Sequence, residues 1–181
     1  MVTVSQSAVE IRTVDTPQDA DRFLDLPQRV YANDPNWVPP LRSSVAKTFA
    51  TDNPFFDYGR LQRFLALRDQ EVVGRIVAAV NDRLIEREGQ KVGLFGYFEC
   101  IDDFSVAQAL LEAACNWLRA QGMTLVRGPI NLSTHNGCLF LVDGFDTPPM
   151  VLMPYNPPYY PQFVAYLRSR LCALLHHRGR N

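Results

Sequence analysis

The chain has 181 residues, of which 47% are hydrophobic and 20% charged, and its 18 Lys and Arg nearly balance its 19 Asp and Glu. This length suits one domain with a sizeable core. The near-neutral balance argues against a nucleic-acid partner, which usually requires a basic surface, and no stretch is apolar over the ~20 residues that a membrane span needs. We therefore expect neither a nucleic-acid partner nor a membrane partner.

The front part of the chain predicts a strand followed by helices. Residues 8–16 alternate apolar and polar side chains as a strand does, and Pro17 marks the start of a helix that runs to about Tyr31. Three prolines within residues 33–41 then break the chain, and residues 42–50 favour one or two further helical turns.

The middle of the chain predicts a β-hairpin and a third strand. Residues 63–69 and 71–82 are rich in aliphatic and β-branched side chains and flank a short polar link, which is typical of paired antiparallel strands. Residues 82–90 predict a charged loop, and residues 91–100 predict the next strand.

An amphipathic helix and a last strand follow. One apolar face of this helix is formed by four residues at helical spacing: Val106, Leu110, Ala113 and Trp117. Gly122 is placed to end the helix, and residues 124–130 predict a strand packed beside the preceding one. The whole order is a mixed α/β layout with an antiparallel front half and a parallel crossover behind.

This layout resembles the GNAT superfamily of N-acetyltransferases. The closer likeness lies in the segments "YANDPNWVPPL", "NPFF", "VGRIVAAVN", "GYFECIDD", "RGPINLST" and "LVDGFDTPPMVLMPYNPPYY". Together they resemble the first half of a family of uncharacterised bacterial GNAT-like proteins whose chains are longer. The resemblance covers roughly residues 9 to 163.

The resemblance implies an acyl-CoA N-acyltransferase fold with a mostly antiparallel sheet flanked by helices. It implies transfer of an acetyl group, or another acyl group carried by coenzyme A, to a small-molecule amine. Glu99 would take the proton of the amine, and Tyr160 would protonate the departing thiolate. The coenzyme would lie along residues at the ends of the central strands and the start of the last helix: Phe98, Cys100, Ile101, Arg127 and Asn156. The alternative for Glu99 is a strand-end charge that faces solvent.

The turn "IDDFSVAQ" departs from the superfamily pattern. Its members hold the coenzyme A pyrophosphate on a glycine-rich turn before a helix, where backbone N–H groups approach the phosphates. Here Asp102 and Asp103 stand at the helix start, one of them as an N-cap, and they would repel a phosphate. A non-catalytic GNAT-like domain that serves for binding therefore remains the alternative to an enzyme.

The end of the chain departs as well. Residues 1–163 form the predicted GNAT-like domain, and residues 164–181 form a basic tail in place of the closing strands of the superfamily. The tail is either the truncated or frame-shifted end of a longer protein or a natural terminal helix. Without closing strands the sheet edge would be exposed, so we expect a homodimer, with disorder beyond about Leu175.

Proline-rich segments carry several aromatic side chains that could line one apolar pocket: Trp37, Phe55, Phe56, Tyr155 and Tyr159. Lids over a sheet edge or an interface remain alternatives for these residues. The run Ser133-Thr134-His135 predicts a polar loop, because no nucleophile elbow surrounds it. Glycine-rich nucleotide motifs are absent from the sequence, which argues against a flavin or nucleotide enzyme.

The cysteines and the N-terminus indicate the compartment. Four widely spaced cysteines lack any CxxC pattern, so we expect reduced, mostly buried thiols and no metal site: Cys100, Cys115, Cys138 and Cys172. The N-terminal segment has no basic region followed by an apolar run. We therefore expect a cytoplasmic protein.

Overall fold

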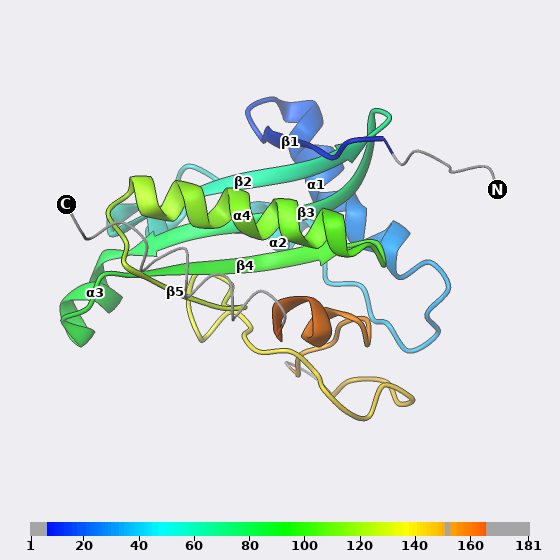
Figure 1. Cartoon of the computed structure of the whole chain (residues 1–181). Helices are drawn as coiled ribbons and strands as arrows, with labels where there is room; N and C mark the ends of the chain where they lie inside the picture. Colours follow the sequence, from blue (N-terminus) through cyan, green and yellow to red (C-terminus); the bar gives the residue numbers. More distant parts are fainter. Residues whose placement is uncertain (1–6, 151–152, 166–181) are drawn as a thin grey trace.

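A five-stranded sheet in the order β1-β2-β3-β4-β5 forms the centre of the protein in a computed structural model, which describes residues 7–150 and 153–165 (Figure 1). The elements are β1 (Glu10–Thr13), α1 (Pro17–Val30), α2 (Arg42–Thr48), the 3-10 turn η1 (Pro54–Asp57), β2 (Gly59–Arg68), β3 (Glu71–Asn81), α3 (Asp82–Glu88), β4 (Val92–Cys100), α4 (Phe104–Ala120) and β5 (Leu125–Arg127). A short helix spans residues 160–165. The first four strands pair antiparallel and β5 runs parallel to β4, which confirms the predicted fold class.

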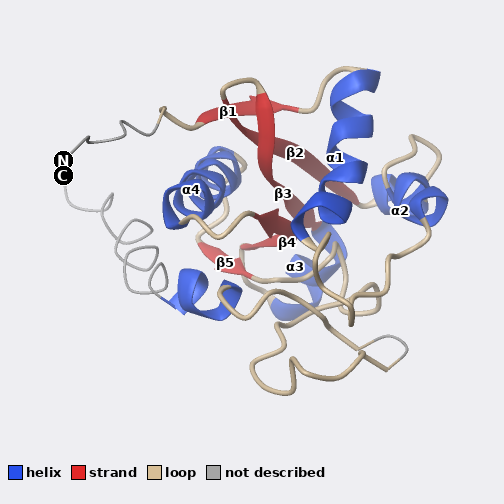
Figure 2. Cartoon of the chain, turned by 90° about the vertical axis from the view of Figure 1, so that its right-hand side faces the viewer, coloured by secondary structure: helices blue, strands red, loops and turns tan. Residues whose placement is uncertain are grey.

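The sheet separates two hydrophobic cores. Successive residues of β2 point to opposite faces, so Phe64 and Ala66 join the core under α4 while Leu65 and Leu67 join the core beside α1. Figure 2 shows α4 on one face of the sheet and α1 and α2 on the other. Because both faces are covered, β3 is buried along almost its whole length.

The predicted hairpin is confirmed, and its turn has a clear backbone basis. Asp69 and Gln70 connect β2 to β3, and both have positive φ, of 50° and 67°. A two-residue turn with two positive φ angles matches the twist of the flanking strands. Polar side chains adopt this conformation more readily than β-branched ones do.

One predicted loop is wrong. Residues 82–90 were expected to form a charged loop, but Asp82–Glu88 is the helix α3. The Asn81 side chain accepts a hydrogen bond from the Leu84 N–H at its start, and Gly89 ends it in the left-handed conformation with φ 66°. The last strand is also shorter than the predicted 124–130, since β5 contains Leu125–Arg127 only.

The predicted domain boundary at residue 163 falls inside the last described helix. Most of the predicted basic tail, including the segment beyond Leu175, lies outside the described residues. Within the parts that the structure describes, no helix is both long enough and apolar enough to cross a bilayer.

Candidate active site

Strand β5 runs beside only the first part of β4. Their pairing ends at Leu94 and Arg127, although β4 continues to Cys100. Just beyond this point the Ile130 N–H donates to the Phe95 carbonyl at 2.7 Å, and the Tyr97 N–H donates to Oδ1 of Asn131 at 2.7 Å. Asn131 thus closes the narrow end of a wedge that opens toward the C-terminal end of β4.

β4 carries a bulge beside the narrow end of this wedge. Val77 pairs with Gly96 and Arg75 pairs with Glu99, so two residues of β4, Tyr97 and Phe98, stand opposite one residue of β3. Tyr97 has a φ of 49°, which an ordinary strand residue does not adopt. A bulge re-aims the side chains that follow it and leaves one residue outside the regular pairing. Here it sets the direction of Phe98 and Glu99.

Glu99 lies in a network of polar side chains from three distant segments. Its Oε2 accepts a hydrogen bond from the Tyr160 hydroxyl at 2.8 Å and another from the Tyr31 hydroxyl at 3.0 Å. Nη2 of Arg75 lies 4.0 Å from the other carboxylate oxygen, Oε1. The Glu99 side chain is 16% exposed, so it is not the solvent-facing charge that was the alternative for it.

Burial dominates the electrostatics of this network. It raises the pKa of Glu99, and the Arg75 guanidinium and the two tyrosine hydroxyls oppose this shift only in part. Burial also raises the pKa of Tyr31 and of Tyr160, and the neighbouring Glu99 charge adds to both shifts. The tyrosines therefore keep their protons, while the carboxylate titrates closer to neutrality than an ordinary glutamate does.

Arg75 fixes the back of the network. It is 5% exposed, and its Nη1 donates to the Phe23 carbonyl at 2.7 Å, while its guanidinium lies over the Phe23 ring. Its Nε has no hydrogen-bond partner within the described residues. The Arg75 charge therefore favours the ionised form of Glu99, although the two side chains do not form a close ion pair.

Tyr160 reaches Glu99 from the first turn of the helix 160–165. Asn156 holds the chain just before this helix: its amide accepts from the Leu141 N–H at 2.7 Å and donates to the Pro157 carbonyl at 2.9 Å. The Tyr160 hydroxyl also accepts the N–H of Cys100 at 2.7 Å. The predicted base and the predicted acid are thus in direct contact.

A cavity of about 650 Å³ opens in front of Glu99 and Tyr160. Glu99 is the one charged side chain on its described wall, which is otherwise mostly aromatic, aliphatic and proline. Trp37 stacks on Tyr31 with ring centroids 4.8 Å apart, and the Tyr155 hydroxyl donates to Asp34 at 2.7 Å. This volume and lining are typical of a small-molecule site.

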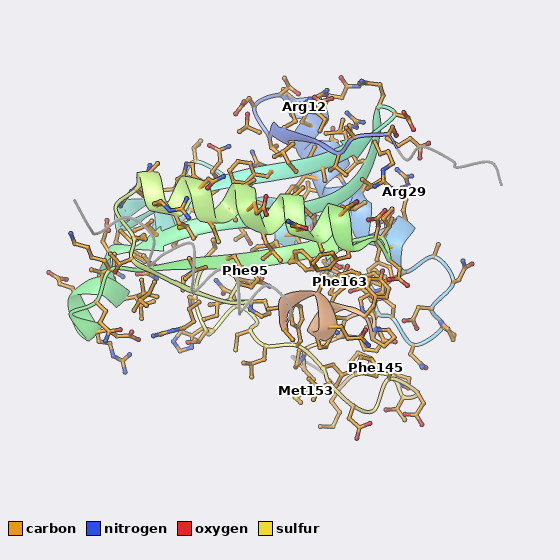
Figure 3. The ribbon with its side chains drawn as sticks, viewed as in Figure 1. Arg12, Arg29, Phe95, Phe145, Met153 and Phe163 are labelled. Atoms are coloured by element: carbon orange, nitrogen blue, oxygen red, sulfur yellow. The ribbon has the colours of Figure 1, made fainter. Side chains whose placement is uncertain are left out.

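The mouth of the cavity is unusually apolar. Its loops carry four side chains that are between 55% and 76% exposed: Val38, Leu139, Met150 and Met153. Figure 3 shows Met153 and Phe145 on the loops that lie beyond the last helix, away from the sheet. Exposed apolar side chains that gather around one opening are typical of a surface that meets a ligand or a partner.

The structure brings only part of the predicted site together. Glu99, Tyr160, Phe98, Asn156, Trp37 and Tyr155 all line the cavity. Phe55 and Phe56 pack against each other elsewhere, 5.8 Å apart. Arg127 forms a two-pronged ion pair with Glu88 of α3, and the Tyr159 hydroxyl donates to the Cys100 carbonyl. The backbone N–H and carbonyl of Cys100 bond to the hydroxyls of Tyr160 and Tyr159. Ile101 packs against the core under α4.

Three residues of the site were missed at the sequence level. Tyr31 ends a helix, Arg75 lies inside an apolar strand, and Asn131 lies in a polar loop. All three lie in segments that carry the family resemblance, but the resemblance assigned none of them a role in the site. Arg75 alone carried a usable signal, because an arginine within the buried run "VVGRIVAAV" requires a partner in the interior.

Tyr160→Phe should destabilise the protein. It leaves the Cys100 N–H without its acceptor and removes one of the two hydroxyl donors to Glu99. We expect the free energy of unfolding to fall by about 2–4 kcal/mol, because each buried polar group left unpaired costs about 1–3 kcal/mol. Urea unfolding measures this, with Tyr155→Phe, on the cavity rim, as the matched control. Equal losses for the two variants would contradict the arrangement.

The N-terminus of α4 is closed by its own residues, as the sequence indicates. Asp103 is the N-cap: its Oδ1 accepts from the Ser105 N–H at 2.8 Å, and its Oδ2 forms an ion pair with Arg68 at 2.7 Å. Burial alone would raise the pKa of Asp103, but the hydrogen bonds from Ser105 and Arg68 outweigh it and hold that pKa below its usual value. The cap therefore stays charged.

Solved structures share the overall fold of this chain. A tandem GNAT protein from the clavulanic acid biosynthesis pathway aligns with a TM-score of 0.60 at 16% identity, covering 88% of this chain and 43% of its own. The fold is that of the GNAT superfamily. A protein described as a GNAT-family acetyltransferase, from Desulfovibrio desulfuricans, aligns with a TM-score of 0.51 at 14% identity, covering 90% of this chain and 83% of its own.

Curated proteins with the same sequence features are longer. The Bacterial ceramide synthase of Caulobacter vibrioides is 47% identical over 150 residues, which cover 81% of this chain and 38% of that protein. Protein YghO of Escherichia coli is 36% identical over 157 residues, which cover 87% of this chain and 40% of that protein. This GNAT-fold chain therefore spans about two fifths of the length of the relatives, and the predicted likeness to part of a longer bacterial protein is confirmed. No family model matches the chain.

Proposed function

We propose that this GNAT-fold chain transfers an acyl group from a thioester to an amine. The observation that carries the proposal is Glu99: a largely buried carboxylate at the end of a bulged, splayed strand, in contact with Tyr160 and facing a cavity. A carboxylate with a raised pKa is suited to accept a proton near neutral pH. The hydroxyl beside it supplies a path for returning that proton.

The proton transfers balance within the described network. The amine nitrogen attacks the thioester carbonyl and gives its proton to Glu99. The carbon–sulfur bond then breaks, and the sulfur takes the proton of the Tyr160 hydroxyl, which recovers one from Glu99 along the 2.8 Å hydrogen bond between them. Glu99 returns to its charged form, and one proton has moved from nitrogen to sulfur.

The cavity favours apolar substrates. Its wall offers one carboxylate for an amine, and aromatic, aliphatic and proline side chains for the rest of the molecule. Among the relatives, the one that is 47% identical is named a ceramide synthase, and ceramides are amides of a fatty acid with a long-chain amine. We therefore place long-chain amines and acyl groups longer than acetyl ahead of acetyl transfer to a polar amine.

The rate of acyl transfer should depend on pH through Glu99. The active form is the carboxylate, so kcat/KM should rise as pH increases through the pKa of Glu99, which burial raises above its usual value. A pH–rate profile with an octanoyl thioester and a long-chain primary amine tests the proposal. With the rate referred to the concentration of neutral amine, an acid limb with its midpoint above the usual range of a glutamate supports it. A flat profile across the acid and neutral range would exclude Glu99 as the base.

A non-catalytic binding domain is the second candidate. It is favoured by the backbone of Cys100, whose N–H and carbonyl are both engaged by tyrosine hydroxyls, from Tyr160 and Tyr159. Binding of an amine or thioester without any turnover by the full-length protein would decide for it. A cytoplasmic homodimer stays a prediction in either case.

A further inference from the structure

We propose that the acyl donor is recognised through its acyl group and pantetheine arm alone, and that the nucleotide end of coenzyme A adds no affinity. The inference rests on the proposed function and names the class of donor: acyl-pantetheine thioesters, whether carried by coenzyme A or by a carrier protein. The structural basis is the N-terminus of α4, where the residues present do not fit a pyrophosphate.

The backbone N–H of Ser105, one of the first donors of α4, is already used. A helix N-terminus binds phosphate through its first N–H groups, which have no partner inside the helix. At the start of α4, Oδ1 of Asp103 accepts both the N–H and the hydroxyl of Ser105, at 2.8 and 2.6 Å. The protein thus supplies its own anion where a phosphate would bind.

The two terminal nitrogens of the cation beside the turn are paired as well, and only its Nε has no hydrogen-bond partner within the described residues. Arg68 donates to Oδ2 of Asp103 at 2.7 Å and to the Ser105 hydroxyl at 3.1 Å. The two side chains of the Arg68–Asp103 pair are 16% and 13% exposed, so the pair is largely withdrawn from solvent. With Asp102 beside it, the turn carries two carboxylates against one guanidinium, and a pyrophosphate there would meet net negative charge.

Aromatic side chains also fill the space beside this turn. Phe163 lies 5.8 Å from Phe104, the first residue of α4, and 5.3 Å from Tyr159, measured between ring centroids. Figure 3 shows Phe163 on the last helix, next to the end of α4 that carries the turn. An apolar cluster suits the pantetheine arm or an acyl chain far better than it suits phosphates.

The wedge itself retains what a pantetheine thioester needs. The chain that follows β5 stays bonded to β4 only as far as Tyr97, the bulge places Phe98 outside the regular pairing, and the cavity lies directly beside it. The two ends of the donor are therefore treated differently. The thioester end has a cavity to bind in, and the nucleotide end has no binding site at the start of α4.

Calorimetric titration of the full chain with octanoyl-CoA and with S-octanoyl-pantetheine, which has no phosphate, tests the proposal. We expect dissociation constants within about threefold of each other, since the phosphates gain nothing at the turn. Octanoyl-CoA binding more than about tenfold tighter than S-octanoyl-pantetheine would overturn the inference while leaving the proposed function standing. If neither thioester binds below 1 mM, a level typical of weak ligands, both are refuted.

Two variants test whether the charge of the turn weakens binding of the nucleotide end. Asp103→Asn keeps an N-cap of equal quality but removes one negative charge and frees Arg68. It should tighten octanoyl-CoA binding by about threefold or more and leave S-octanoyl-pantetheine unchanged. Asp52→Asn removes the same charge from an exposed loop and should change neither. Equal tightening of both ligands by Asp103→Asn would contradict a charge effect on the nucleotide end.

The source of the thioester is decided by a third ligand. An octanoyl carrier protein that binds more tightly than both small thioesters would assign the donor to carrier proteins. A carrier protein that binds more weakly than octanoyl-CoA would assign it to free coenzyme A thioesters. In both cases the inference about the nucleotide end depends only on the comparison of octanoyl-CoA with S-octanoyl-pantetheine.

Discussion

Glu99→Gln is expected to slow acyl transfer by about 10²–10⁴-fold, the usual contribution of a positioned general base. Glutamine is close to glutamate in shape, and its amide oxygen can still accept from the hydroxyls of Tyr31 and Tyr160. It cannot take a proton from the amine. The acid limb of the pH–rate profile should disappear with it, because burial of the carboxylate sets that limb.

The same substitution should have only a modest effect on folding. The amide nitrogen replaces a carboxylate oxygen near Arg75, so we expect a loss of about 1–2 kcal/mol in the free energy of unfolding. Glu88→Gln is the matched control, because Glu88 pairs with Arg127 away from the cavity and its loss should leave the rate unchanged. An unchanged rate for Glu99→Gln would remove Glu99 as the base.

Gly96→Ala is expected to be the most damaging small substitution in the sheet. A Cβ built at Gly96 would lie 2.4 Å from the Ile130 carbonyl oxygen and 2.7 Å from Oδ1 of Asn131, which caps the Tyr97 N–H. The backbone at Gly96 or at Ile130 must move to make room for the added Cβ. The bulge of β4 and the Asn131 contact at the narrow end of the wedge would then shift as well. We expect a loss of about 2–4 kcal/mol, from overpacking and from the lost hydrogen bond.

Urea unfolding and the acyl-transfer assay measure the two consequences. Gly89→Ala is the control. Apart from its two chain neighbours, no residue has an atom within 4 Å of the added Cβ, but Gly89 has a φ of 66°, so only the backbone strain of about 1 kcal/mol should appear. Gly89→Ala should also leave the rate unchanged. A Gly96→Ala protein that is as stable and as active as the unmodified protein would show that the wedge does not depend on this close approach.

The order of the strands was predictable because each strand has a local pattern. The hairpin was marked by two β-branched runs around Asp69 and Gln70, and α4 by its apolar face ending before Gly122. The helix α3 was missed because "DRLIEREGQ" is dominated by charges. It is held by its caps, Asn81 and Gly89, and by Leu84 and Ile85, which pack against the two cores.

The site was only partly predictable because it is assembled across the chain. Glu99 and Tyr160 were recognisable from the resemblance, but Tyr31 lies 68 residues from Glu99 and makes contact only through the fold. Phe55 and Phe56 share the composition of the cavity residues, yet Phe55 packs into the core beside α1, and Phe56 lies exposed against it. Composition identifies aromatic segments, and only the packing of those segments decides which of them meet.

The backbone amide of Cys100 offers a direct view of how this site opens. It donates to the Tyr160 hydroxyl, a side chain 60 residues away, and not to a neighbouring strand. Its exchange with deuterium therefore requires the helix 160–165 to move away, whereas amides in the middle of the sheet must await a larger unfolding event. The exchange rate at this one position would report the free energy of opening the site while the rest of the domain stays folded.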